Sequence, residues 1–194
     1  MDPRLGAIVA RHGPPPLWDR RGGFRTLALI ILEQQVSIKS AATLFRRIDR
    51  SLAGGVNAAS VTRAGEHGLR ALGLTRQKAG YFVSLATAAT DGTLDFARLR
   101  RLSDADVLAE LTRVRGIGPW SACIYLLMVL RRPDVWPPGD LALHLALARL
   151  RRQNRVPRSD EAERYARRWR PHRAVAARIL WHGYLSDRPR IASS

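Results

Sequence analysis

The sequence predicts an all-α protein, and three observations support that prediction. Apolar residues recur at helical spacing through most of the 194 residues. No alternation of apolar and polar residues persists long enough to indicate a β-strand. Ser, Thr or Asp stands before several apolar segments, and Gly or Pro separates them, as expected for helix caps and breaks. We therefore expect around ten helices.

The first half of the chain divides at these caps and breaks. Residues 1–23 are basic and rich in Pro and Gly, so we interpret them as an N-terminal arm. Three expected helices then cover 24–35, 60–72 and 95–102. Two more begin after caps: one runs from Ser37 to about 48, and the other from Thr75 to about 90.

Residues 103–131 form a predicted helical hairpin. A helix capped by Ser103 ends at Gly116-Ile117-Gly118, and Pro119 suits the first position of the next helix because its missing N–H would be unpaired there. Glycines allow another chain to approach closely, and the amides of a helix N-terminus suit a phosphate oxygen. Taken alone, however, this pattern is most often only a turn between two helices.

A stiff loop, 136–140, follows the hairpin and ends at Asp140. Its sequence is Trp-Pro-Pro-Gly-Asp, and an apolar helix is expected over 141–150. An Asp that opens a helix is ordinarily an N-cap, and the helix amides favour its anion. Further helices are expected from Ser159 through Trp169, and from Pro171 through Trp181.

Composition restricts the classes of partner and compartment. The net charge of +17 and the pI of about 11.6 indicate a polyanionic partner, and charge alone fits DNA and RNA equally well. Cys123 is the single cysteine, so no disulfide can form within the chain, and we expect a core thiol in a reducing, cytoplasmic compartment. No secretory signal is visible, and the longest apolar run, 122–130, is too short to span a bilayer.

The hairpin and Asp140, which lies twenty residues after Trp120, together resemble the helix-hairpin-helix (HhH-GPD) superfamily of DNA glycosylases. Within it, the chain is similar to the 3-methyladenine DNA glycosylase II (alkylpurine) family, with further matching segments at 32–42, 72–79 and 164–181. The resemblance covers about 24–185 and leaves 186–194 as a tail. We expect a minimal form without the N-terminal β-domain of the longer bacterial enzymes. It implies two helical lobes with a cleft for DNA and the excised base between them.

The resemblance implies a chemical role for Asp140. Excision of a base builds positive charge on the deoxyribose, which a nearby carboxylate stabilises, and the same group can orient or deprotonate water. Relatives that also cut the strand carry a lysine where this chain has Trp120, so the expected enzyme is a monofunctional hydrolase that leaves an abasic site. Because only one cysteine is present, a four-cysteine iron–sulfur cluster is excluded.

The resemblance also implies a base pocket. Its matched positions are Trp120, Trp181, Ile124 and Leu141. Tryptophan rings would stack on a cationic alkylated purine such as 3-methyladenine or 7-methylguanine. Without the resemblance, both tryptophans would be interpreted as core residues.

The remaining matched positions concern DNA. Gln35 corresponds to the residue that fills the gap left by the flipped nucleotide, where bacterial members often carry leucine; otherwise it merely joins two helices. Gly116, Ile117 and Gly118 would bind the DNA backbone. The carbonyls of Thr112, Val114 and Gly116 would hold a K⁺ or Na⁺ ion, and no other cofactor is expected.

The expected partner is double-stranded DNA with a damaged base, bound by a monomer. Two alternatives stay open at this point. One is a superfamily glycosylase for oxidised or mismatched bases, which the absent lysine and absent cysteine cluster disfavour. The other is a non-catalytic helix-hairpin-helix DNA-binding protein, which the Pro-Pro-Gly-Asp loop disfavours.

Overall fold

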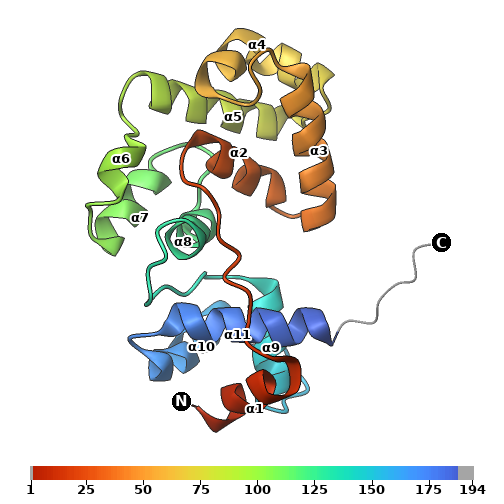
Figure 1. Ribbon diagram of the computed structural model, residues 1–194, viewed down its shortest axis with the longest axis vertical. Helices are drawn as coiled ribbons and strands as arrows, with labels where there is room; N and C mark the ends of the chain where they lie inside the picture. Colours follow the sequence, from red (N-terminus) through yellow and green to blue (C-terminus); the bar gives the residue numbers. More distant parts are fainter. Residues whose placement is uncertain (1, 188–194) are drawn as a thin grey trace, which may run out of the picture. The chain divides into compact units, whose positions relative to one another are not determined.

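A computed structural model describes residues 2–187, and every regular element within them is helical (Figure 1). The prediction of an all-α protein is confirmed. Seven α-helices lie between residues 20 and 130: α2 (Phe24–Glu33), α3 (Ile38–Ser51), α4 (Ala58–Ala71), α5 (Arg76–Thr90), α6 (Phe96–Leu99), α7 (Asp104–Thr112) and α8 (Pro119–Met128). The other described helices are α1 (Pro3–His12), α9 (Leu141–Leu150), α10 (Ser159–Ala166), the 3₁₀ helix η1 (Arg167–Trp169) and α11 (Arg173–Ser186).

The chain divides into two compact units. The central unit comprises residues 20–130, and the terminal unit comprises 2–19 together with 131–187 of the described residues. Residues 188–194, which make up most of the predicted tail, lie outside the described part of the chain. No helix among residues 2–187 is both long and apolar enough to cross a membrane.

Four of the predicted helix starts are confirmed by their caps. The side chains of Ser37, Thr75, Ser103 and Asp140 each accept a hydrogen bond from the backbone N–H three residues later, at 2.8–3.2 Å. These bonds satisfy amides that have no partner within the helix itself.

Several element boundaries differ from the sequence-based expectation: α2 ends at Glu33 rather than at 35, and α6 covers only Phe96–Leu99 of the expected 95–102. Three other differences have a visible cause. Helix α4 begins at Ala58 rather than at 60, because Asn57 Oδ1 accepts the Ser60 N–H at 2.9 Å and caps it. Within the predicted arm, residues 3–12 form α1, which is capped by Asp2, packs against α11 and buries Leu5. The last helix begins at Arg173 rather than at Pro171, because the His172 N–H donates to the Trp169 carbonyl at 2.7 Å in a separate turn.

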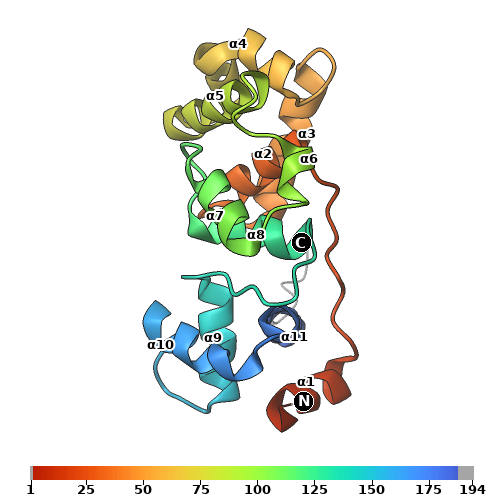
Figure 2. The same ribbon diagram turned by 90° about the vertical axis from the view of Figure 1, so that its left-hand side faces the viewer.

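Helix α2 is the core of the central unit. Its residues Leu27, Ala28, Ile30 and Ile31 are fully buried, and the helix packs against α3, α5 and α8. Since burial of each large aliphatic side chain is worth roughly 1.5–3 kcal/mol, this helix stabilises all three of its neighbours. Figures 1 and 2 both show α5 lying along α4, and α7 packs against α8 in the same unit.

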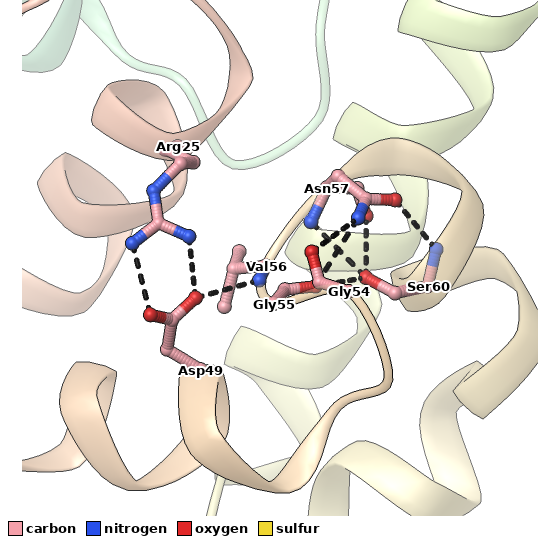
Figure 3. Close-up of polar contacts among 7 residues, drawn as sticks. All are labelled: Arg25, Asp49, Gly54, Gly55, Val56, Asn57 and Ser60. Carbon is pink, nitrogen blue, oxygen red and sulfur yellow. Dashed lines mark hydrogen bonds and ion pairs between the residues drawn. The ribbon is translucent and has the colours of Figure 1, made fainter.

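A polar network closes the loop between α3 and α4 (Figure 3). Arg25 of α2 binds both carboxylate oxygens of Asp49 of α3, and Asp49 Oδ1 also accepts the Val56 N–H at 2.8 Å. The Arg25 guanidinium and this backbone donor hold the pKa of Asp49 below its usual value. The loop is therefore anchored to α2, and it delivers Asn57 to the start of α4.

Helix α11 organises the terminal unit. It packs against α1, α9 and η1, and Figure 2 shows α9 lying between α10 and α11. The approach of α1 is close at Gly183, where a Cβ would lie 2.9 Å from Ile8 Cγ2. Arg178 of α11 is buried, with 7% of its surface exposed, and its Nε donates to the Leu17 carbonyl at 3.0 Å. This bond attaches the segment after α1 to α11.

Candidate functional site

The predicted hairpin is present in the central unit, and its two glycines have different surroundings. Gly116 has φ +96°, and a Cβ there would lie 2.2 Å from Cγ of Tyr81. Both the backbone conformation and the packing therefore require glycine at 116. Gly118 is exposed, has φ −89°, and would place a Cβ within 4 Å of no described atom. The open space at Gly118 faces solvent, not the core.

The N-terminus of α8 begins directly at this open glycine. Gly118 is the N-cap of α8 and has no side chain with which to occupy the first amides, and Pro119 follows at the first helical position. Partial positive charge from the helix dipole therefore accumulates at an exposed surface. This arrangement can bind an anionic oxygen such as that of a phosphate.

The turn between α2 and α3 presents Gln35. Gln35 is exposed and has φ +61°, in the left-handed region that non-glycine residues seldom adopt. On one side of it, Gln34 Nε2 donates to the Gly116 carbonyl at 2.7 Å and to Ser121 Oγ at 3.0 Å. These two bonds connect the turn directly to the hairpin within the same unit.

A predicted cation ligand, the Gly116 carbonyl, already accepts the Gln34 amide. A cation at that oxygen would use the second lone pair of the carbonyl, because the first is occupied by the Gln34 N–H. The carbonyl of Val114 accepts the Ile117 N–H at 3.0 Å and retains a second lone pair. Among residues 2–187, no cluster of three or more His, Cys, Asp or Glu side chains could hold a metal ion.

In the terminal unit, Asp140 is the N-cap of α9 and is half-buried. Its Oδ1 accepts the Leu143 N–H at 2.8 Å and the Trp181 Nε1–H at 3.1 Å. The ring of Trp181 contacts Trp18 edge-to-face, with centroids 6.2 Å apart. Two N–H donors from α9 and α11 thus fix the orientation of the carboxylate.

The loop that leads to Asp140 is anchored at several points. Asp134 binds Arg173 of α11 through Arg173 Nε at 2.7 Å and Nη2 at 3.0 Å, and this guanidinium holds the pKa of Asp134 below its usual value. The Trp136 ring packs on Trp169, with centroids 5.8 Å apart.

A further anchor lies next to the carboxylate itself. The Gly139 N–H donates to Ser159 Oγ at 3.1 Å, at the start of α10. The loop is consequently held from α10, η1 and α11, and Asp140 projects from a braced segment.

The four predicted pocket residues differ in exposure. Trp120, the second residue of α8, is partly exposed, and Leu141 is 66% exposed beside Asp140. Trp181 is 8% exposed and Ile124 is 3% exposed, so their side chains are packed among other residues. Trp181 has a contact that the sequence did not predict, the hydrogen bond to Asp140.

His144, one turn after Asp140 on α9, is buried, and its Nε2 has no hydrogen-bond partner among the described residues. Burial holds the pKa of His144 below its usual value, although the carboxylates of Asp140 and Glu163 oppose that shift.

This buried histidine predicts a pH-dependent stability. The unfolded chain takes up a proton near the ordinary histidine pKa of about 6.5, whereas the folded chain resists it. The contribution of His144 to the free energy of unfolding is therefore fully present above pH 6.5 and is lost as the pH falls below it. We expect thermal melts between pH 7.5 and 5 to show a smaller decline for His144→Leu than for wild type. His67→Leu, at an exposed histidine of α4, is the control and should retain the wild-type slope; equal slopes for all three proteins would contradict the prediction.

Several residues that build the site were missed from the sequence. Arg173 and Asp134 are 39 residues apart, and Ser159 and Gly139 are 20 apart, so no local pattern relates them. Gln34 is the exception, because it adjoins Gln35. Two amide side chains in succession at a helix end are the one local pattern that could have pointed to its role.

The fold and these contacts define a helix-hairpin-helix protein with an exposed helix N-terminus and a carboxylate on a braced loop. The chain belongs to the family of HhH-GPD superfamily base excision DNA repair proteins, whose model matches residues 28–171.

Comparisons with individual proteins agree with this membership. The chain is 27% identical to the Bacillus subtilis protein YfjP over 184 residues, which is 91% of this chain and 64% of YfjP. It is 32% identical to the DNA-3-methyladenine glycosylase of the same organism over 108 residues, which is 56% of this chain and 36% of that protein. The chain thus spans less than two thirds of the length of these relatives.

A solved structure matches over most of both chains. The Schizosaccharomyces pombe 3-methyladenine DNA glycosylase Mag1, solved in complex with abasic DNA, has a TM-score of 0.82 and 25% identity, covering 92% of this chain and 88% of Mag1. The helical fold is therefore shared with a DNA glycosylase over nearly the whole described chain.

Proposed function

We propose that this protein is a monofunctional DNA N-glycosylase that flips an alkylated purine out of duplex DNA and hydrolyses its N-glycosidic bond, leaving an abasic site for base excision repair. Membership of the HhH-GPD family and the similarity to proteins named 3-methyladenine glycosylases support this proposal. The excised bases would include 3-methyladenine and 7-methylguanine.

The observation that carries the proposal is the geometry of Asp140. A partly exposed carboxylate, oriented by an indole N–H and a backbone N–H on a braced loop, suits electrostatic stabilisation of positive charge on a sugar. Preorganisation matters because a group that is already oriented loses little free energy to reorganisation in the transition state. The same carboxylate would orient the attacking water.

The positions of the lysines support hydrolysis without strand cleavage. Position 120 carries tryptophan, so the hairpin supplies no amine nucleophile there. Lys78 directs its ammonium to two backbone carbonyls, and Lys39, the only other lysine, lies on the first turn of α3. A Schiff base with the sugar would need an amine placed at the reaction centre.

Base recognition is assigned to apolar and aromatic surface. The partly exposed Trp120 would stack on the flipped base, since an electron-rich ring attracts a cationic purine. Leu141 would contribute apolar surface beside the acid, whereas Ile124 and Trp181 would shape the pocket from within the packed side chains. Gln35 would fill the gap in the duplex and hydrogen-bond to the orphaned base.

The partner is damaged double-stranded DNA, bound by one copy of the chain. The amides of Gly116 and Gly118 and the abundant arginines would contact phosphates, so affinity should fall steeply with salt. The predicted Ile117 amide instead donates to the Val114 carbonyl at 3.0 Å and shapes the turn. A K⁺ or Na⁺ ion would be held by the carbonyls of Thr112, Val114 and Gly116, where it would add positive charge for a phosphate.

A single-turnover excision assay tests the proposal. Duplexes that carry one alkylated purine, hypoxanthine, uracil or 8-oxoguanine are incubated with excess protein, and released base and strand breaks are measured separately. We expect release of the alkylated purine, with strand breaks appearing only after alkali treatment. Tight binding without release from any duplex would leave a non-catalytic DNA-binding protein, and preferential release of 8-oxoguanine would point to the oxidised-base alternative.

A further inference from the structure

Two polar side chains outside the proposed chemistry hold the Gln35 turn, one by bonding to the hairpin and the other by bonding from α5. Gln34 precedes Gln35, and its amide reaches the Gly116 carbonyl at 2.7 Å and Ser121 Oγ at 3.0 Å. Ser121 is 2% exposed and lies in the first turn of α8. The amide therefore bonds on both sides of Gly118, the open glycine at the start of α8.

Lys78 of α5 fixes the same turn from the other side. Its Nζ donates to the carbonyls of Leu32 and Gln34 at 2.7 and 2.9 Å, at the C-terminal end of α2. A cation is favoured there because the last carbonyls of a helix carry partial negative charge and have no partner within the helix. Partial burial lowers the pKa of Lys78, so the ammonium is held in this place at a desolvation cost.

The left-handed backbone conformation of Gln35 explains why the turn needs these contacts. A non-glycine residue in the left-handed region costs roughly 1–2 kcal/mol and persists only where its surroundings enforce it. The carbonyl and side chain of Gln34, the residue immediately before Gln35, are both hydrogen-bonded, whereas Gln35 itself is exposed. The strained residue is consequently presented to solvent from a fixed base.

We propose that Gln34 and Lys78 are positioning residues, which hold Gln35 at a set place relative to the α8 N-terminus. Insertion of Gln35 into the duplex and binding of phosphate at the hairpin then act on one stretch of DNA together. This inference rests on the proposed function, because it takes Gln35 to be the residue that enters the duplex. Neither Gln34 nor Lys78 is assigned a contact with the substrate.

Amide hydrogen exchange of the DNA-free protein tests the structural half of the inference. Gln34→Met keeps the length of the side chain but removes its donor, and Lys78→Met does the same for the ammonium. We expect faster exchange in both segments 33–37 and 116–121 for Gln34→Met, and in 33–37 for Lys78→Met. The control is Arg76→Met, at an exposed position of α5, which should leave both segments unchanged.

Single-turnover excision and a fluorescent adenine analogue beside the lesion test the functional half. Because small displacements of reacting groups can lower rates about 10²-fold, we expect Gln34→Met and Lys78→Met to slow base release by roughly 10- to 100-fold. The fluorescence rise that reports base flipping should fall in parallel. The Kd of Gln34→Met for the duplex should stay close to that of wild type, and the Kd of Lys78→Met should stay close to that of Arg76→Met, which loses the same charge.

A double-mutant cycle with Gln35→Ala separates positioning from general damage. If Gln34 acts through Gln35, then Gln34→Met should have little further effect in the Gln35→Ala background, so that the two changes are non-additive. Equal effects of Gln34→Met in both backgrounds would overturn the inference, as would unchanged exchange in 116–121. Absence of base release by the wild-type protein would instead refute the proposed function, and the exchange measurement would still report on the connection itself.

Discussion

Asp140→Asn should abolish most base release, by about 10²-fold or more, without weakening DNA binding. The substitution removes the negative charge that stabilises the sugar cation, and loss of one preorganised electrostatic group in other enzymes costs about 10²–10³-fold. Asparagine is as good an N-cap as aspartate, and its Oδ1 can still accept from Leu143 and Trp181. Single-turnover release of an alkylated purine, with Kd and Tm measured in parallel, checks the prediction.

A matched control separates the effect of the lost carboxylate charge on base release from its effect on thermal stability. Asp134→Asn on the same loop is the matched control, since it also removes one carboxylate charge but at the Arg173 anchor. We expect Asp134→Asn to lower thermal stability more and base release less than Asp140→Asn. If Asp140→Asn retained wild-type rates, the assignment of Asp140 as the catalytic group would be withdrawn.

Gly116→Ala should destabilise the central unit by about 3 kcal/mol, a fall of roughly 10 °C in Tm. An alanine at φ +96° is strained by roughly 1–2 kcal/mol, and its Cβ would lie 2.2 Å from Tyr81 Cγ, so overpacking adds about 1–3 kcal/mol. If the Tyr81 ring moved aside to make room for the added methyl group, part of the turn would become exposed to water. Thermal melts followed by circular dichroism measure the change.

Gly118→Ala is the matched control within the same Gly-x-Gly sequence. Its φ of −89° is ordinary for alanine, and a Cβ would meet nothing within 4 Å, so Tm should stay close to that of wild type. DNA affinity should nevertheless fall, because the added methyl group occupies the space through which a phosphate approaches the amides. Comparable losses of Tm in both variants would contradict the different roles of the two glycines.

Local signals in the sequence predicted much of the fold. Helix periodicity and the caps at Ser37, Thr75, Ser103 and Asp140 depend on residues three or four positions apart, which can be recognised without knowing the tertiary structure. The prediction missed α1, because Pro and Gly within the first 23 residues obscured a short helix that its packing on α11 stabilises.

The candidate site could be predicted only in part, for a related reason. Asp140 and the two glycines were identifiable because their residue types and spacing are local features. The Trp181–Asp140 hydrogen bond, the Asp134–Arg173 pair and the Gln34–Gly116 bond join residues 39 to 82 positions apart. Such pairs depend on which helices pack against one another, and a single sequence does not show directly which tertiary contacts form.

The division of the chain into units has a consequence for how the protein is made. Residues 20–130 are continuous, so every contact of the central unit, including the Gly116 turn and its Gln34 partner, can form once residue 130 has left the ribosome. Asp140 differs, because its supports Ser159, Arg173 and Trp181 are all synthesised after it, and α1 must wait for α11. During synthesis the surface proposed to grip DNA is therefore completed first, and the acid is set in place last.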